Sequence, residues 1–312
     1  SPASGYRSRC EFGYKNGSYT MVKDGKKVLL DHFDLPVSAI QNIMKPLLEL
    51  INTNPLINKK LFQINFRAVN QIVLVTLIYH KQLDQNWLES ARIIETKLAI
   101  NVLGRSKNQL LATHLTELEQ YIDINPSYYL YQNDKTFYQP NAFLMPKMVK
   151  LVISLIENPR DLLELYCGSG TFTIPLSYSF KNVFATENNR ESISYLKKSI
   201  HKNHIKNIFY ARLSDIELMD AYKGRIFRRL ENIDLKNFNF SHVLVDPPRS
   251  GLSHNVTEIL NKFENIIYIS CNPDTFKRDL DKLKDYRIKK LEVFDQFSNT
   301  PHLELIALLI KR

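Results

Sequence analysis

The stretch ELYCGSGTF, residues 164–172, carries the signal that decides the fold. A buried-type strand runs into a turn that holds Gly168 and Gly170, and glycine lets the backbone turn tightly and approach a ligand closely. The next strand ends at Glu187, where a carboxylate can accept hydrogen bonds from ribose hydroxyls. This series predicts a cofactor site at the end of a sheet.

The glycine pattern favours one cofactor over another. A full GxGxxG is absent because position 173 is Thr, so the turn offers no clear cradle for a pyrophosphate. S-Adenosylmethionine has no phosphates to hold, and we therefore favour it over a dinucleotide. A plain tight turn followed by a surface Glu187 is the alternative.

Strands and helices alternate from about residue 160 to the end of the chain. Such alternation is typical of a doubly wound parallel sheet, and the last two strands, joined by a short loop, should pair antiparallel. The predicted strands span 161–167, 182–187, 208–214, 241–248, 265–271, 288–295 and 303–311, and helices are predicted after the glycine turn, at 191–203 and at 273–284.

The first part of the chain has a different pattern. SYTMVKDGKKVLL (18–30) has an Asp24-Gly25 turn between strand-like arms, which indicates a hairpin. Amphipathic helices are predicted at 36–51 and 86–98, with two strands between them at 60–80. We therefore expect an N-terminal α+β domain over 1–138, extending further upstream because no Met begins it, and a catalytic domain over 139–312.

Size, charge and cysteine content limit the function classes. The 312 residues are enough for two domains, and the net charge of +10 favours a polyanionic partner because Lys and Arg displace counterions from phosphates. A solvated lysine face is the alternative. Three scattered cysteines form no disulfide framework and no CxxC pair, and no run resembles a membrane span or secretory signal. We therefore expect a cytoplasmic protein without a metal site.

Two further motifs place reactive side chains at strand ends. VLVDPPRSGL (243–252) puts Asp246 at the end of one strand, and IIYISCNPDTF (266–276) puts Cys271 at the end of the next. Ligands of doubly wound sheets lie beyond the carboxyl ends of the strands, so both side chains should face the crevice beside Gly168. An Asp-Pro-Pro that merely starts a loop is the alternative for the first motif.

A cysteine in a cofactor crevice indicates a nucleophile. C5 of a pyrimidine is too weakly nucleophilic to take a methyl group directly, but thiolate addition at C6 creates an enolate whose C5 can attack a sulfonium methyl. A base must then remove the C5 proton, and HLELIALL (302–309) supplies Glu304, with His302 on the same face of the strand. A solvated strand-end carboxylate is the alternative for Glu304.

In this order and spacing, DPPRSGL, ISCNPDTF and HLE resemble the RNA uracil-5-methyltransferase family. FYQPN (137–141) and ELYCGSGTF match its cofactor motifs, while LFQINF and LIYHKQLDQNW resemble its bacterial tRNA branch. The resemblance implies a Rossmann-like class I S-adenosylmethionine-dependent methyltransferase domain behind an N-terminal RNA-binding domain. It also implies that the substrate is the tRNA T loop, at position 54.

The resemblance implies a role for each matching residue. Cys271 would be the nucleophile, Glu304 the base, and Asp246 would also orient the uracil. Phe62, in LFQINF, would stack on a splayed loop base, with a place in the core as the alternative. Relatives often carry Asn at the position of Thr171, whose hydroxyl could still bond the cofactor. The cofactor contacts would be Gln139, Tyr166, Gly168, Thr171, Glu187 and Asp246.

Three other functions compete with this interpretation. The ribosomal-RNA branch of the family typically adds a four-cysteine iron–sulfur site, and many members add a small β-barrel; neither is present in this sequence. An RNA-binding or RNA-folding protein would explain the charge but not the combination of Cys271, Glu304 and Asp246. A small-molecule methyltransferase would explain the sheet but neither the cysteine nor the charge. We expect a monomeric tRNA methyltransferase without an iron–sulfur cluster.

Overall fold

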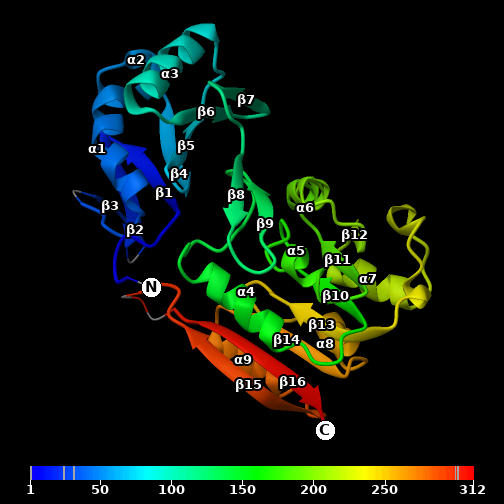
Figure 1. Ribbon diagram of the computed structural model, residues 1–312. Coiled ribbons are helices and arrows are strands. Elements are labelled where there is room, and N and C mark those ends of the chain that lie inside the picture. Colours follow the sequence, from blue (N-terminus) through cyan, green and yellow to red (C-terminus); the bar gives the residue numbers. More distant parts are fainter. Residues whose placement is uncertain (1, 24, 31, 299, 301) are drawn as a thin grey trace.

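The computed structural model describes residues 2–23, 25–30, 32–298, 300 and 302–312. In this part of the chain, two seven-stranded sheets are joined by a two-stranded ribbon (Figure 1). The α/β architecture predicted for the second half and the α+β architecture predicted for the first are both confirmed. The predicted boundary at residue 138 lies between the ribbon and the helix that leads into the second sheet, and it remains a prediction.

The N-terminal sheet has the order β3-β2-β1-β4-β5-β6-β7 and is antiparallel except between β5 and β6. The predicted hairpin forms β2 and β3, although Asp24 of its turn lies outside the described residues. The elements are β1 (Arg9–Lys15), β2 (Ser18–Lys23), β3 (Lys26–Leu29), α1 (Ser38–Asn52), α2 (Pro55–Asn58), β4 (Leu61–Val69), β5 (Ile72–Tyr79), α3 (Gln85–Leu98), β6 (Asn101–Ser106) and β7 (Gln109–Ala112).

The sheet of the predicted catalytic domain, called the catalytic sheet below, has the order β12-β11-β10-β13-β14-β16-β15. Its first five strands are parallel, and β16 pairs antiparallel with both β14 and β15, as predicted. The strands are β10 (Asp161–Leu165), β11 (Asn182–Glu187), β12 (Ile208–Arg212), β13 (Phe240–Val245), β14 (Asn265–Ser270), β15 (Tyr286–Phe294) and β16 (Glu304–Lys311).

Helices cover both faces of this sheet because neighbouring residues of each strand point to opposite sides. Leu162 packs in one core with helices α4, α5 and α6, whereas Leu163 packs in the other with α7, α8 and α9. The predicted helix after the glycine turn is a single turn, α5 (Thr173–Leu176). The others are α4 (Met145–Ser154), α6 (Arg190–Lys202), α7 (Asp215–Tyr222), α8 (His254–Leu260) and α9 (Pro273–Leu280), with 3-10 turns at Arg228–Leu230 and Leu235–Asn237.

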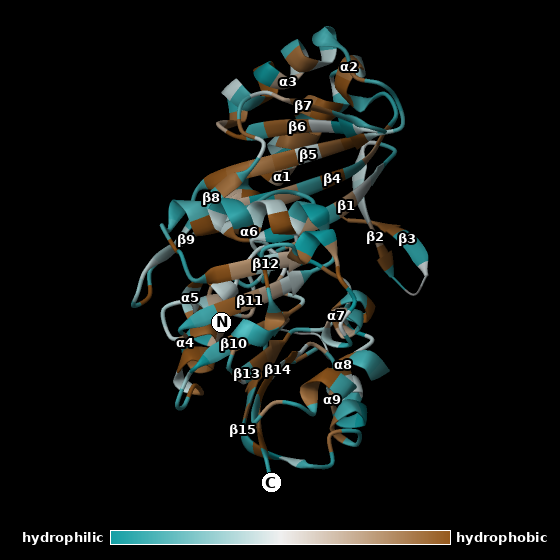
Figure 2. Cartoon of the chain, turned by 90° about the vertical axis from the view of Figure 1, so that its right-hand side faces the viewer, coloured by the Kyte–Doolittle hydropathy of each residue, from teal (hydrophilic) through white to brown (hydrophobic). Residues whose placement is uncertain are grey.

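The two sheets each enclose an apolar interior, visible as brown strands in Figure 2. The ribbon of β8 (Leu118–Ile122) and β9 (Tyr128–Gln132) connects them, and α6 satisfies its edge. Asn203 accepts a hydrogen bond from the Tyr129 backbone N–H (2.8 Å) and donates one to its carbonyl (2.8 Å). Because these bonds imitate strand pairing, the ribbon is fixed to the catalytic half.

A turn at residues 133–138 contacts both halves of the chain. Arg67 of β4 donates to the Thr136 carbonyl (2.6 Å) and lies over the Tyr138 ring at 4.6 Å, while Asn133 donates to Glu191 of α6 (3.0 Å). The turn therefore holds the FYQPN segment between the two sheets. Within the described ranges, no helix is both long enough and apolar enough to cross a membrane.

Candidate active site at the carboxyl ends of the parallel strands

The predicted reactive side chains meet at one edge of the catalytic sheet. Parallel β10, β13 and β14 end at neighbouring residues, and Tyr166, Asp246 and Cys271 follow directly. Strand β13 stops at Asp246 because the prolines that follow, Pro247 and Pro248, have no backbone N–H for a ladder. The strand order therefore places Asp246 and Cys271 at the same edge of the sheet.

The antiparallel partner of β14 brings the predicted base to the predicted nucleophile. Ser270 pairs with Leu305, so the next residues along each strand, Cys271 and Glu304, lie opposite each other. Glu304 is 3% exposed, which contradicts the alternative of a solvated strand-end carboxylate, whereas Cys271 is half-buried. Asn272 caps α9 and donates to the Arg249 carbonyl (3.2 Å), which ties the cysteine loop to the Asp-Pro-Pro loop.

These groups disfavour negative charge in one another. Burial raises the pKa of Cys271, and the Glu304 and Asp246 carboxylates raise this pKa further. Burial and Asp246 raise the pKa of Glu304, and burial raises the pKa of Asp246. Arg249 opposes the rise in the pKa of Cys271 and of Glu304, a contribution the sequence prediction missed. The site thus holds protons near neutral pH, and Arg249 is its local source of positive charge.

The glycine turn presents backbone rather than side chain to the crevice. Gly168 has φ of +57°, and a Cβ added there would meet nothing within 4 Å, so a ligand can approach its backbone. Glu187 accepts from the Gly168 N–H (3.1 Å) and from the Asn189 N–H (2.7 Å), and its remaining lone pairs stay available to hydroxyl donors. Thr171, the next residue after the turn, is partly exposed. An open glycine backbone beside a carboxylate fits the ribose of S-adenosylmethionine.

Gln139 is buried beside this turn. Its side-chain amide is oriented by Gln296, a residue that the sequence prediction did not include. Gln296, which is fully buried, donates from Nε2 to the Gln139 Oε1 (2.6 Å). If both amides were turned over, the NH2 group of Gln296 would be buried without a hydrogen-bond partner. It would also lose its contact with the Met148 sulfur, which lies 3.8 Å from Nε2. The Gln139 Nε2 has no hydrogen-bond partner among the described residues and can donate to a ligand.

Phe62 lies in the other sheet and is not brought to this edge. Its ring stacks on His80 with centroids 3.8 Å apart and planes 11° from parallel. It is partly exposed rather than buried in the core. Arg67, which contacts the 133–138 turn, lies five residues after Phe62 along β4, so the two residues are roughly 17 Å apart.

Cys10 and Cys167 are both buried thiols, the first in β1 and the second inside the glycine turn. Burial raises the pKa of Cys10 to about 12 and the pKa of Cys167 well above its usual value, so neither is a thiolate near neutral pH. Among the described residues, no group of three or more His, Cys, Asp or Glu side chains is arranged to hold a metal ion.

Known proteins share both the sequence and the fold of this chain. A protein from Campylobacter concisus named tRNA/tmRNA (uracil-C(5))-methyltransferase is 42% identical over 97% of this chain and 85% of its own length. A protein of the same name from Saccharophagus degradans is 40% identical over 100% of this chain and 89% of its own length.

A solved structure and a family profile agree with these relatives. The Pyrococcus abyssi tRNA (uracil-54, C5)-methyltransferase, solved with S-adenosyl-L-homocysteine, superposes with a TM-score of 0.78 at 22% identity, covering 99% of this chain and 77% of that one, and so shares the fold. The profile described as tRNA (Uracil-5-)-methyltransferase matches residues 1–312. The chain belongs to the tRNA (uracil-5-)-methyltransferase family.

Proposed function

We propose that this protein uses S-adenosylmethionine to methylate C5 of a uridine in tRNA, at position 54 of the T loop. The observation that carries the proposal is the strand register that sets Cys271 opposite Glu304, with Asp246 at the same edge. The names of the relatives support the same activity. As parts of the proposal, the protein acts in the cytoplasm as a monomer without a metal or iron–sulfur cluster.

The proposed chemistry begins at the Cys271 sulfur. The thiolate attacks C6 of the uracil, a bond forms between sulfur and C6, and the displaced electron pair makes an enolate through C5 and O4. Bound S-adenosylmethionine would supply an electrophilic methyl group to C5, with the electron pair of the broken sulfur–methyl bond staying on sulfur in the S-adenosylhomocysteine that leaves. Glu304 then removes the C5 proton, the bond between sulfur and C6 breaks, and the thiolate is released.

The charges around the cysteine fit a nucleophile that is activated only with substrate in place. Two carboxyl groups and burial raise the pKa of Cys271, which keeps the thiol protonated in the free protein. The Arg249 guanidinium stabilises the thiolate and, once uracil is bound, the enolate oxygen. Asp246 orients the ring, and Gln139, Tyr166 and Gly168, together with Thr171, Glu187 and Asp246, hold the cofactor.

The N-terminal half would bind the RNA. A partly exposed Phe62 stacked on the exposed His80 forms a two-ring surface on which a splayed loop base can stack. The net charge of +10 supports attraction to the phosphate backbone.

Methyl-labelled S-adenosylmethionine, offered with an unmodified tRNA transcript and with ribosomal RNA separately, tests the proposal. We expect the label in 5-methyluridine at position 54 of the tRNA. Label in ribosomal RNA alone would preserve the mechanism but refute the substrate, and RNA binding without label in either RNA would refute the activity.

A further inference from the structure

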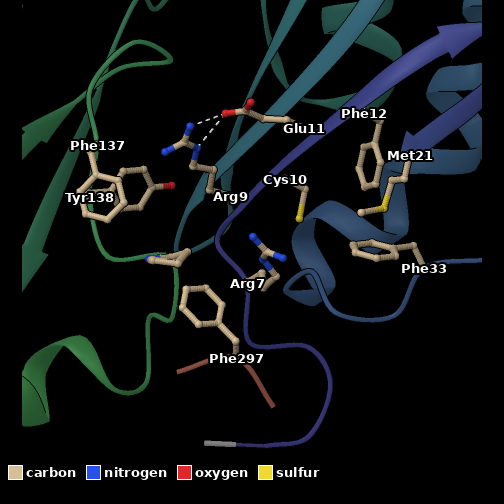
Figure 3. A pocket seen from close by; sticks show the side chains of 11 residues that line it. Arg7, Arg9, Cys10, Glu11, Phe12, Met21, Phe33, Phe137, Tyr138 and Phe297 are labelled. Atoms are coloured by element: carbon tan, nitrogen blue, oxygen red, sulfur yellow. Dashed lines mark hydrogen bonds and ion pairs between the residues drawn. The ribbon is translucent and has the colours of Figure 1, made fainter. Parts of the chain in front are cut away.

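A hollow of about 300 Å³ lies where the N-terminal sheet meets the FYQPN segment (Figure 3). Its walls include Arg9 and Glu11 of β1, Arg7 just before that strand, and the aromatic rings of Phe137 and Phe297. None of its lining residues lines the hollow beside Glu187 that is expected to receive the cofactor. The proposed cofactor and the reacting cysteine therefore leave this space unexplained.

The hollow shares its walls with elements of the active site. Phe137 lies two residues before Gln139, and Phe297 follows Gln296, whose side chain orients Gln139. The backbone of Arg7 forms an antiparallel bridge with Asn141 in the same segment. A group bound in the hollow would therefore lie beside the segment that carries Gln139.

Arg7 supplies positive charge that is not neutralised by the described residues around it. The Arg7 Nε is buried and has no hydrogen-bond partner among the described residues. The Arg7 side chain also forms no ion pair with any of these residues. Arg9, in contrast, is paired with Glu11. The Arg7 guanidinium lies 5.8 Å from the centroid of the Phe297 ring and can still receive an anion.

The aromatic walls suit a flat, unsaturated ring. Phe137 is 57% exposed although it is a large apolar side chain, and Phe297 is partly exposed beside it (Figure 3). Proteins that hold unpaired RNA bases combine such rings with arginine, because each base can stack while its phosphate pairs with the guanidinium. The volume is at the lower end of small-molecule sites, which excludes a duplex.

We propose that this hollow binds one further nucleotide of the substrate RNA, next in the loop to the uridine that is methylated. Its phosphate lies at Arg7 and its base stacks against Phe137 and Phe297. This inference rests on the proposed function, which requires that a loop nucleotide be drawn out of its stack beside the active site.

Filter binding of an unmodified tRNA transcript tests the phosphate contact. Between about 50 and 200 mM salt, Arg7→Gln should weaken binding and reduce the slope of log affinity against log salt by about 0.7, the value for one phosphate of a single strand. Arg287→Gln is the matched control. Arg287 is exposed near the start of β15, and the opposite end of that strand is the one that pairs with Glu304. The slope of this variant should equal that of the wild type.

Abasic substitutions test the base. An abasic unit is placed at each loop position in turn, and at the position that occupies the hollow it should weaken binding to the wild type about tenfold. Phe297→Leu and Phe137→Leu should each weaken binding of the normal RNA. The same abasic unit should cause no further loss of affinity in either variant. Melting temperature and S-adenosylmethionine affinity should match the wild type. Because Phe137 is exposed, its variant gives a result even if Phe297→Leu lowers the melting temperature.

Two results would overturn the inference. One is a wild-type salt slope for Arg7→Gln. The other is that the loss of affinity from each Phe variant adds to the loss from the abasic unit at every loop position. Such additivity would show that no base occupies the hollow. Failure of the proposed function has a separate signature, because the wild type itself would then leave the labelled methyl group off the tRNA.

Discussion

At the scale of single residues, Cys271 and Glu304 should fail in different ways. Cys271→Ala should lower methylation by more than about a thousandfold, because no bond to C6 can form. Glu304→Gln should lower turnover about 10²–10⁴-fold and accumulate a covalent protein–RNA adduct, because the C5 proton is not removed and the sulfur cannot leave. Transfer of the labelled methyl group to tRNA measures turnover, and denaturing gel electrophoresis with labelled tRNA detects the adduct.

The controls separate chemistry from folding. Both variants should bind S-adenosylmethionine as the wild type does. The double variant should form no adduct, because the sulfur that makes the bond is gone. Loss of turnover in Glu304→Gln without any adduct would mean that Glu304 positions the ring rather than taking the proton.

Gln296 offers a sharper test because its effect depends on pH. We predict that it fixes the amide of Gln139 so that Nε2 faces the cofactor. In Gln296→Glu, the buried carboxyl is neutral at low pH and its O–H can replace the lost donor. As pH rises it ionises, accepts the Gln139 N–H instead, and should weaken S-adenosylmethionine binding about tenfold.

Calorimetric titration of S-adenosylmethionine across pH 6–9, roughly the range in which a buried carboxyl titrates, measures the change in affinity. Gln296→Met is the control, since it fills the same space without a donor and should bind the cofactor weakly at every pH. Equal affinity of Gln296→Glu and the wild type throughout would show that Gln139 does not depend on this orientation.

At the scale of elements, the two glycines of the turn have separate tasks. A Cβ at Gly170 would lie 2.7 Å from the Leu196 Cδ1 of α6, and φ there is +100°, so Gly170→Ala should cost about 1–3 kcal/mol of unfolding free energy. A Cβ at Gly168 would meet no atom within 4 Å, so Gly168→Ala should lower the unfolding free energy less and should chiefly weaken cofactor binding. Urea unfolding and cofactor titration separate the two effects.

The double variant Gly170→Ala/Leu196→Ala identifies the cause of the loss. Removing the Leu196 side chain relieves the clash but not the backbone strain. The pair should therefore cost less than the sum of the single variants. Strict additivity would show that the close approach of α6 does not matter.

Elements with local signals were predicted well. Strands β10 to β16 lie within two or three residues of their predicted ends, because apolar runs bounded by glycine, proline or asparagine mark both where a strand packs and where it stops. The ribbon of β8 and β9 was missed, since its edge is completed by Asn203 rather than by another strand. The single-turn length of α5 was missed as well.

At the scale of the whole molecule, the sequence predicted which candidate side chains lie together at one sheet edge but not what surrounds them. Asp246 and Cys271 follow from topology, because the ends of parallel strands share an edge. Gln296 and Arg7 act through partners 157 and 134 positions away in the chain, Gln139 and Asn141, and such contacts have no period or spacing to reveal them. Arg249 stands inside a recognised motif, yet only the fold reveals its effect on the pKa of Cys271.

One buried histidine should make a separable contribution to the acid sensitivity of the whole molecule. His242 is fully buried at the start of β13, and burial together with nearby Arg160 lowers its pKa to about 4. Its Nδ1 lies 2.8 Å from the Ser241 hydroxyl, and its Nε2 has no partner among the described residues. The native imidazole is therefore neutral where an unfolded one, with a pKa of 6.5, would be charged.

Unfolding consequently takes up a proton as pH falls through the window from 6.5 to about 4. At this one group the unfolded state binds more protons, so the contribution of His242 to stability falls by up to about 3 kcal/mol as pH falls. Asp246 and Glu304 contribute with the opposite sign, because their raised pKa values make the native state hold more protons there. Urea unfolding at several pH values measures this loss. His242→Gln, whose amide can still bond to Ser241, should lack this part of the pH dependence. Parallel curves for the two proteins would mean that other groups cause the acid sensitivity.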